Sequence, residues 1–225
     1  MWSVSLAICS KDLRLLVSRG SALVQGVLLG LLVIFIFSLA QGVGEQLSPQ
    51  SAATIFWISS LFCQVLLFNQ IYALEEQNQA RVALVLLPVP ALAIWLAKTL
   101  CILILLLFAQ LFFLPALCIF LGQSPSGSLG VGLLGIVFVD LGTCSLGSLL
   151  GALAQGQVSR ESLVSILLFP LISPILLAGI GIHTETLGGG ESDPSTWLFL
   201  TLAYDAIFFA VSCFLFPFIY TGEDA

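Results

Sequence analysis

Charged side chains are scarce in this sequence. Only 8% of its 225 residues are Asp, Glu, Lys or Arg, against about 25% in soluble domains. Apolar residues make up 59% of the chain, and the mean hydropathy is +1.15. So few polar groups cannot cover a folded surface in water. The composition therefore excludes an ordinary soluble domain and a nucleic-acid-binding protein, and it indicates a chain whose solvent is lipid.

Catalytic and metal-binding patterns are also missing. The chain has a single histidine, His183, which we expect as an exposed polar residue at the membrane interface. Its six cysteines follow no metal-ligand or redox spacing, so we expect small buried residues. There is no P-loop. Gly130–Gly135 spells a dinucleotide fingerprint but opens an apolar run and follows no strand. We interpret these glycines as helix-packing sites, together with Gly26 and Gly30 and with Gly147 and Gly151.

Six apolar runs are long enough to cross a bilayer, which takes about 20 residues per helix. They cover residues 23–43, 52–72, 91–121, 129–154, 163–182 and 197–220. The third run exceeds one perpendicular span, so we expect Lys98 to mark its interfacial start and Pro115 to kink it. The predicted fold class is an all-α membrane protein with six transmembrane helices, in a single domain over residues 1–225.

The basic residues predict the orientation of these spans. All six fall on one side of the membrane, at Lys11, Arg14, Arg19, Arg81, Lys98 and Arg160. Cytoplasmic loops collect Lys and Arg, so both termini are predicted on the cytoplasmic side of the membrane. Residues 1–21 carry apolar side chains at helical spacing and predict an interfacial elbow helix against anionic lipid, or else a plain positive flank. Cleavage of the first span after Ser38–Ala40 is the alternative to a retained helix.

Two acidic residues fall within predicted spans, Asp140 in the fourth and Asp205 in the sixth. A carboxylate at the centre of a bilayer costs about 2.5–3.5 kcal/mol, so each is expected to turn inward. Paired intramembrane aspartates would suit a protease, but Val139–Gly142 lacks the Gly-x-Gly-Asp pattern of such enzymes. We favour a structural or gating role over an intramembrane enzyme.

The connection over residues 74–90 is the longest polar segment on the predicted cytoplasmic side. An acidic opening is followed by a short apolar stretch, Val82–Leu87, and two prolines. This pattern predicts a helix lying on the membrane face that docks a soluble partner, with an ordinary interfacial loop as the alternative. The residues predicted to serve this contact are Glu75, Glu76, Gln77, Asn78, Arg81, Pro88 and Pro90.

Two proline-containing stretches carry a family resemblance. Leu86–Pro90 continues into Leu96-Ala97-Lys98, and Phe169–Leu176 holds a second pair of prolines. Both resemble signatures of the CcmB family, the membrane subunit of the ABC-type transporter in bacterial cytochrome c maturation. The resemblance covers essentially the whole chain. At Asn78–Val82 the sequence departs from the family's Asp-Gly-Ser-Leu-Glu, which shifts the expected acidic contacts to Glu75 and Glu76.

The resemblance implies a non-catalytic ABC-2-type permease with a cytoplasmic coupling helix. A separate ATPase of the CcmA type would hydrolyse ATP, and CcmC- and CcmD-type membrane proteins would complete the complex. ATP hydrolysis would release a haem-loaded chaperone of the CcmE type, so haem is handled by the complex, with no cofactor assigned to this chain. Two copies per complex are expected. The alternative is an ABC-2-type permease for another cargo, such as a lipid, a polysaccharide or a drug.

Overall fold

A computed structural model describes residues 2–19, 21–42, 47–77, 89–154, 160–189 and 194–221. These residues form seven helices and, within those ranges, no strand. The helices are α1 (Trp2–Arg19), α2 (Ser21–Leu39), α3 (Pro49–Gln77), α5 (Ala91–Phe120), α6 (Leu129–Leu153), α7 (Arg160–Thr186) and α8 (Pro194–Thr221). All except α1 are long and apolar enough to cross a membrane, which confirms the predicted six-helix fold class.

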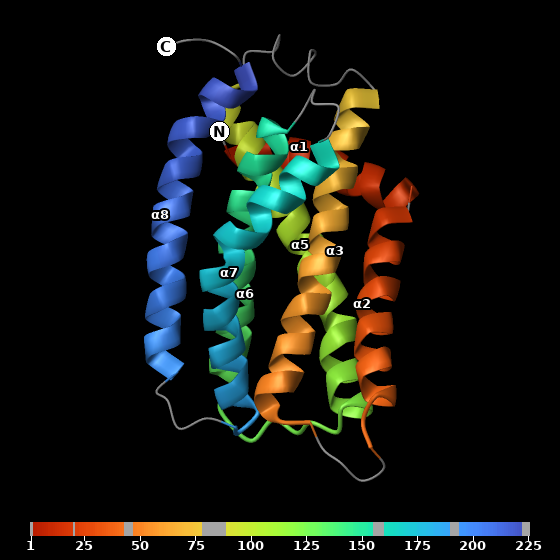
Figure 1. Ribbon diagram of the computed structural model, residues 1–225. Coiled ribbons are helices and arrows are strands. Elements are labelled where there is room, and N and C mark those ends of the chain that lie inside the picture. The colour runs from red at the N-terminus through yellow and green to blue at the C-terminus, as the bar shows by residue number, and fades with distance from the viewer. Residues whose placement is uncertain are drawn as a thin grey trace.

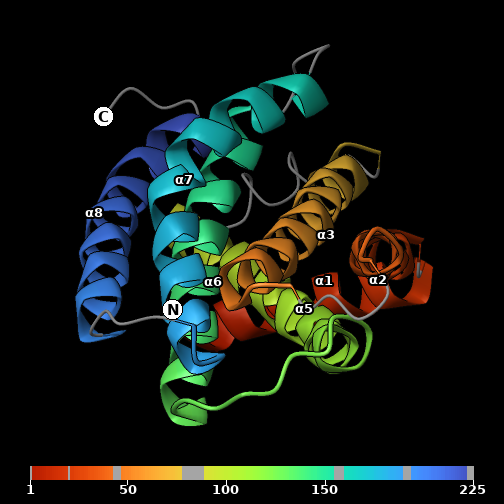
Figure 2. The same ribbon diagram turned by 60° about the horizontal axis from the view of Figure 1, so that its bottom comes forward.

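The six long helices stand side by side, with α2 and α8 on opposite sides of the bundle (Figures 1 and 2). Between them, α3, α5, α6 and α7 pack against one another; α2 covers α3 and α5, while α8 covers α6 and α7. The inner helix α3 is more buried than the outer helices. In the apolar span of α3, 67% of the residues are buried, against 28% in α2 and 22% in α8. The outer helices therefore present most of their apolar side chains to lipid.

Helix α1 runs across the bundle rather than along it, and the last turns of α8 lie at the same end (Figure 1). We call this the α1 end, and the opposite one, where α3 and α6 begin, the far end. The lysines and arginines that the structure describes are Lys11, Arg14, Arg19, Lys98 and Arg160, and all lie in the half toward the α1 end. This arrangement agrees with the one-sided distribution of charge in the sequence.

Several helices extend beyond the predicted spans. Helix α3 runs over 29 residues and α7 over 27, because their polar ends continue the helix outside the apolar run. Helix α2 instead ends at Leu39, four residues before the predicted limit. Pro115 lies inside the continuous helix α5. Helix α7 holds Pro170 and Pro174, and its first turns bend away from the rest of the helix (Figure 1).

Glycines allow the helices to pack closely, as the sequence predicts. A methyl group at Gly26 would overlap Cys63 of α3, and one at Gly30 would overlap Phe113 of α5. On α6, Gly147 and Gly151 face the rings of Phe68 and Tyr72, and Gly132 and Gly135 face α7 in the same way. Gly130 is the exception, because a methyl group there would meet nothing closer than 3.9 Å. Small residues thus let α6 approach both α3 and α7.

Candidate functional site

An ionic cluster is buried at the α1 end of the bundle. The side chain of Lys98, two turns into α5, is completely buried, and its ammonium lies 2.7 Å from Oδ2 of Asp12 in α1. It also forms an ion pair with Glu75, which is 3% exposed in the last turns of α3. A buried charge is tolerated only when it is paired and hydrogen-bonded, and Lys98 here has two carboxylates. One side chain therefore joins three helices.

Tyr72 supports this cluster from one turn earlier in α3. The ammonium of Lys98 lies 5.8 Å from the centre of its ring, a cation–π distance. The hydroxyl of Tyr72 donates a 2.6 Å hydrogen bond to the carbonyl of Ser148 in α6. Gly151 makes room for the ring, because a methyl group there would overlap it. The cluster of Asp12, Tyr72, Glu75 and Lys98, called the Lys98 cluster below, thus ties α6 to the other three helices.

The sequence analysis places Lys98 at the interfacial start of the third span, and the structure adds that its side chain is buried inside the protein. The helix begins seven residues earlier, at Ala91, and Lys98 is buried about 10 Å further along its axis. A lysine at that depth in an apolar helix requires an acidic partner. The sequence contains this signal, but it does not say which of the distant acids would meet the lysine.

The predicted docking residues divide into three groups. Glu75 was expected at the surface but faces the interior, because Lys98 neutralises it there, whereas Glu76 is exposed on the next position of the helix. Gln77 ends α3, and the exposed Pro90 precedes α5, where its carbonyl accepts a 2.8 Å hydrogen bond from the Ala93 N–H. Asn78, Arg81 and Pro88, and with them the predicted helix Val82–Leu87, lie outside the described residues.

A second buried polar group lies in the middle of the bundle. Asp140 of α6 is 1% exposed, and its Oδ1 accepts a 3.1 Å hydrogen bond from Nε2 of Gln110 in α5. The same Nε2 lies 3.2 Å from the hydroxyl of Ser60 in α3. Among the described residues, no group donates to Oδ2 of Asp140. The sequence correctly predicts that this acid turns inward, but it gives no sign of Gln110 as its partner.

Asp205 of α8 is also turned into the bundle. It is 9% exposed and lies against Gly142 of α6, where a methyl group would collide with its Oδ1. Neither carboxylate oxygen has a hydrogen-bond partner among the residues that the structure describes. The neighbouring Tyr204 donates a 3.1 Å hydrogen bond to the carbonyl of Leu171 in α7. Asp205 thus occupies a contact between α6 and α8 that only glycine permits.

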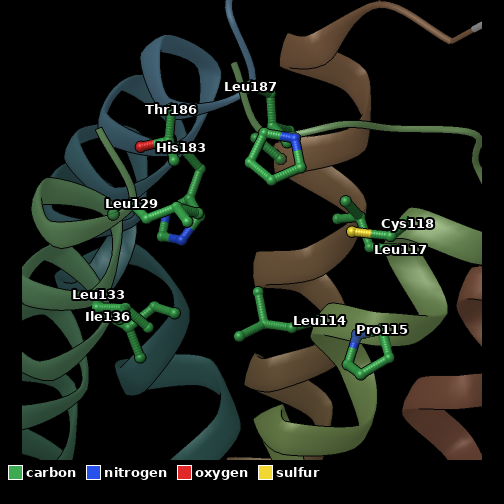
Figure 3. Close-up of a pocket in the computed structure, with 13 residues that line it drawn as sticks. Leu114, Pro115, Leu117, Cys118, Leu129, Leu133, Ile136, His183, Thr186 and Leu187 are labelled. Atoms are coloured by element: carbon green, nitrogen blue, oxygen red, sulfur yellow. The ribbon is translucent and has the colours of Figure 1, made fainter. Parts of the chain in front are cut away.

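His183 is a further correction, because it is buried rather than exposed. The residue is 6% exposed, and its ring stacks on Phe56 and meets the edge of Trp57, both in α3. It lines a cavity of ≈ 300 Å³ at the far end, between α5 and α6 (Figure 3). Cys118 of α5 lines the same cavity and is exposed, whereas the other cysteines are buried or partly buried. Sequence separation conceals that this histidine and this cysteine line the same cavity.

Comparison with known proteins places these residues in a family context. The model of the CcmB protein family matches residues 3–220, a range that includes the Lys98 cluster, both intramembrane acids and His183. Heme exporter protein B of Pseudomonas aeruginosa is 28% identical over 198 residues, which cover 84% of each chain. Heme exporter protein B of Rhodobacter capsulatus is 29% identical over 182 residues, covering 77% of this chain and 79% of the relative.

Proposed function

Because the chain belongs to the CcmB protein family, we propose that it is the membrane permease subunit of an ABC-type haem exporter in cytochrome c biogenesis. The two relatives are named as haem exporter subunits and align over more than three quarters of this chain. We place the α1 end, with both termini and residues 74–90, on the cytoplasmic side of a bacterial inner membrane. The gathering of basic residues at that end supports this orientation.

The Lys98 cluster is the observation that supports a coupling role. Residues 78–88 connect α3 to α5, and the two helices are joined directly by the ion pair of Glu75 with Lys98. The second ion pair, with Asp12, extends the joint to α1. A paired charge in a low-dielectric interior holds its geometry firmly, because separating the partners leaves a charge buried alone. A displacement of residues 74–90 by an ATPase would therefore move α1, α3 and α5 together.

In this proposal the chain is not itself a catalyst. A CcmA-type ATPase hydrolyses ATP, CcmC- and CcmD-type proteins complete the membrane complex, and the motion releases a haem-loaded CcmE-type chaperone. Glu76, exposed beside Glu75, and the segment Asn78–Pro88 form the contact with the ATPase. Two copies of the chain pair with the two docking faces of an ATPase dimer. Glu75 acts as a positioning residue for this contact rather than as part of it.

Deletion of the gene, combined with purification of the protein, tests the proposal. Deletion is expected to abolish c-type cytochromes, and a tagged copy of the chain should restore them. The tagged chain, extracted in mild detergent, should carry an ATPase and a CcmC-type protein, both identified by mass spectrometry. A strain with normal c-type cytochromes, whose tagged chain instead retains an ATPase encoded beside genes for lipid or polysaccharide export, would show that the cargo is different.

A further inference from the structure

We infer that the far-end cavity binds a long-chain lipid alcohol, that is, an amphiphile whose hydroxyl group donates a hydrogen bond to His183. The inference is independent of the coupling role proposed above, because the cavity and the Lys98 cluster lie at opposite ends of the bundle. It depends on the tautomer of one imidazole, on the shape and depth of the cavity, and on where the cavity opens.

The hydrogen bond of His183 fixes what its ring can recognise. Nδ1 lies 3.0 Å from the carbonyl oxygen of Gly179, one turn earlier in α7. A carbonyl can only accept, so Nδ1 carries the proton and Nε2 of the neutral ring has a free lone pair. None of the described residues donates a hydrogen bond to that nitrogen. A ligand in the cavity that carries a hydroxyl group can therefore supply the donor.

The ring is held rigidly against rearrangement. Phe56 stacks on it with ring centres 5.2 Å apart, and Trp57 meets it edge-on at 5.3 Å. Gly179 leaves the space that Trp57 occupies, since a methyl group there would overlap the indole. The acceptor is thus fixed in place before a ligand arrives, which lowers the cost of binding. In Figure 3 the ring lies on the side of the cavity opposite Leu114 of α5.

The rest of the lining accepts an alkyl chain. Apart from His183, the hydroxyl of Thr186 is the polar group at this end, and it already donates a 2.8 Å hydrogen bond to Ile182. A second cavity of ≈ 380 Å³ continues along the groove between α5 and α6, and its lining is apolar except for Gln110, whose Nε2 already binds Asp140 and Ser60. The two share Leu114, Leu133 and Ile136, and together they extend from Cys118 to Ile104. That is about 21 Å along α5, a length that suits a chain rather than a compact molecule.

The position of His183 along α7 and the side on which the cavity opens indicate where the ligand comes from. His183 lies one turn before the end of α7, so its acceptor is at the level of the membrane interface, while the groove leads toward the bilayer centre. A membrane amphiphile lies in this same orientation, with its polar head at the interface. Leu129 and Leu133, beside the cavity, are 60% and 57% exposed on the lipid-facing surface. The ligand therefore arrives from the bilayer leaflet at the far end.

Photolabelling of the full chain in lipid nanodiscs tests this inference. The probe is hexadecanol with a diazirine in the middle of its tail, and the labelled peptides are identified by mass spectrometry. Label is expected on α5 and α6 around Phe108 and Leu133. Unlabelled hexadecanol should compete about fivefold better than hexadecyl methyl ether, which keeps the chain and the oxygen but has no proton to donate.

Two variants complete the experiment. In His183→Asn the side-chain amide can still donate to Gly179 but has no acceptor at the place of Nε2, so the alcohol should lose its advantage over the ether. If that variant does not fold, Leu133→Phe narrows the opening and should reduce labelling by the alcohol without changing its preference over the ether. Equal competition by alcohol and ether in the wild-type chain would overturn the inference. Label spread equally over the lipid-facing sides of α2 and α8 would overturn it too.

Discussion

At the α1 end, a buried ammonium is neutralised by two carboxylates, whereas the acids in the middle of the bundle accept at most one hydrogen bond from the described residues. Lys98 pairs with Asp12 and Glu75, but Asp140 has one amide donor and Asp205 has no described donor. The first arrangement resists change, because each partner holds the other. The second leaves buried carboxylate oxygens without a hydrogen bond from the described residues, so it contributes less to stability. We expect the Lys98 cluster to contribute more to stability than these acids do, and the α1 end to move as a unit in the proposed coupling.

Replacing the central cation should have the largest effect on stability. Lys98→Met removes the ammonium between two buried carboxylates, so the free energy of unfolding should fall by about 3–5 kcal/mol. Urea unfolding in detergent micelles, followed by tryptophan fluorescence, measures this loss. The control is Lys11→Met, because Lys11 also pairs with Asp12 but is 43% exposed, and such a pair contributes about 0–1 kcal/mol. Equal stability of the two variants would mean that the Lys98 cluster does not hold the α1 end.

A methyl group beside the cluster should have the next largest effect. Gly151→Ala places a carbon against the ring of Tyr72, which cannot move without losing its hydrogen bond to Ser148. We expect a loss of about 1–3 kcal/mol from overpacking in the same unfolding assay. Gly130→Ala, on the same helix but in open space, should leave stability unchanged. If both substitutions are neutral, α3 and α6 are not in close contact at this point.

Changes in the middle of the bundle should cost no more than the methyl group at Gly151, and they should depend on hydrogen bonding rather than charge. Asp140→Asn keeps an oxygen for Nε2 of Gln110, so its cost should be below about 1 kcal/mol. Asp140→Leu removes that acceptor and should cost about 1–3 kcal/mol. The measurement is the difference in the free energy of unfolding between these two variants. An Asn variant as unstable as the Leu variant would show that charge matters here, and the contrast between the two regions would fail.

The sequence predicts the architecture more completely than the sites. Runs of apolar residues are enough to predict the six spans, because the thickness of the bilayer dictates their length. The partners of Lys98 are not predictable in this way. Asp12 and Glu75 are separated from it by 86 and 23 residues, and only the packing of α1 and α3 on α5 brings them together.

The prediction for His183 was wrong for a related reason. Its place near the end of an apolar run is typical of an exposed interfacial residue, and nothing nearby in the sequence reveals Phe56 and Trp57 on another helix. The glycines were predictable because close packing needs small residues on the helix itself, whatever the neighbour is. The sequence thus predicts features that depend on a single helix, whereas it does not predict contacts between distant helices.

The most direct test of the coupling role is the amount of haem-loaded chaperone released per ATP hydrolysed by the purified complex. Glu75→Leu breaks the joint between α3 and α5 but leaves Lys98 paired with Asp12, so the complex should still assemble and hydrolyse ATP. Release per ATP should fall well below that of the wild-type complex, while Lys11→Leu, at the exposed edge of the same network, should match the wild type. Unchanged release per ATP in Glu75→Leu would contradict a transmission role for the Lys98 cluster.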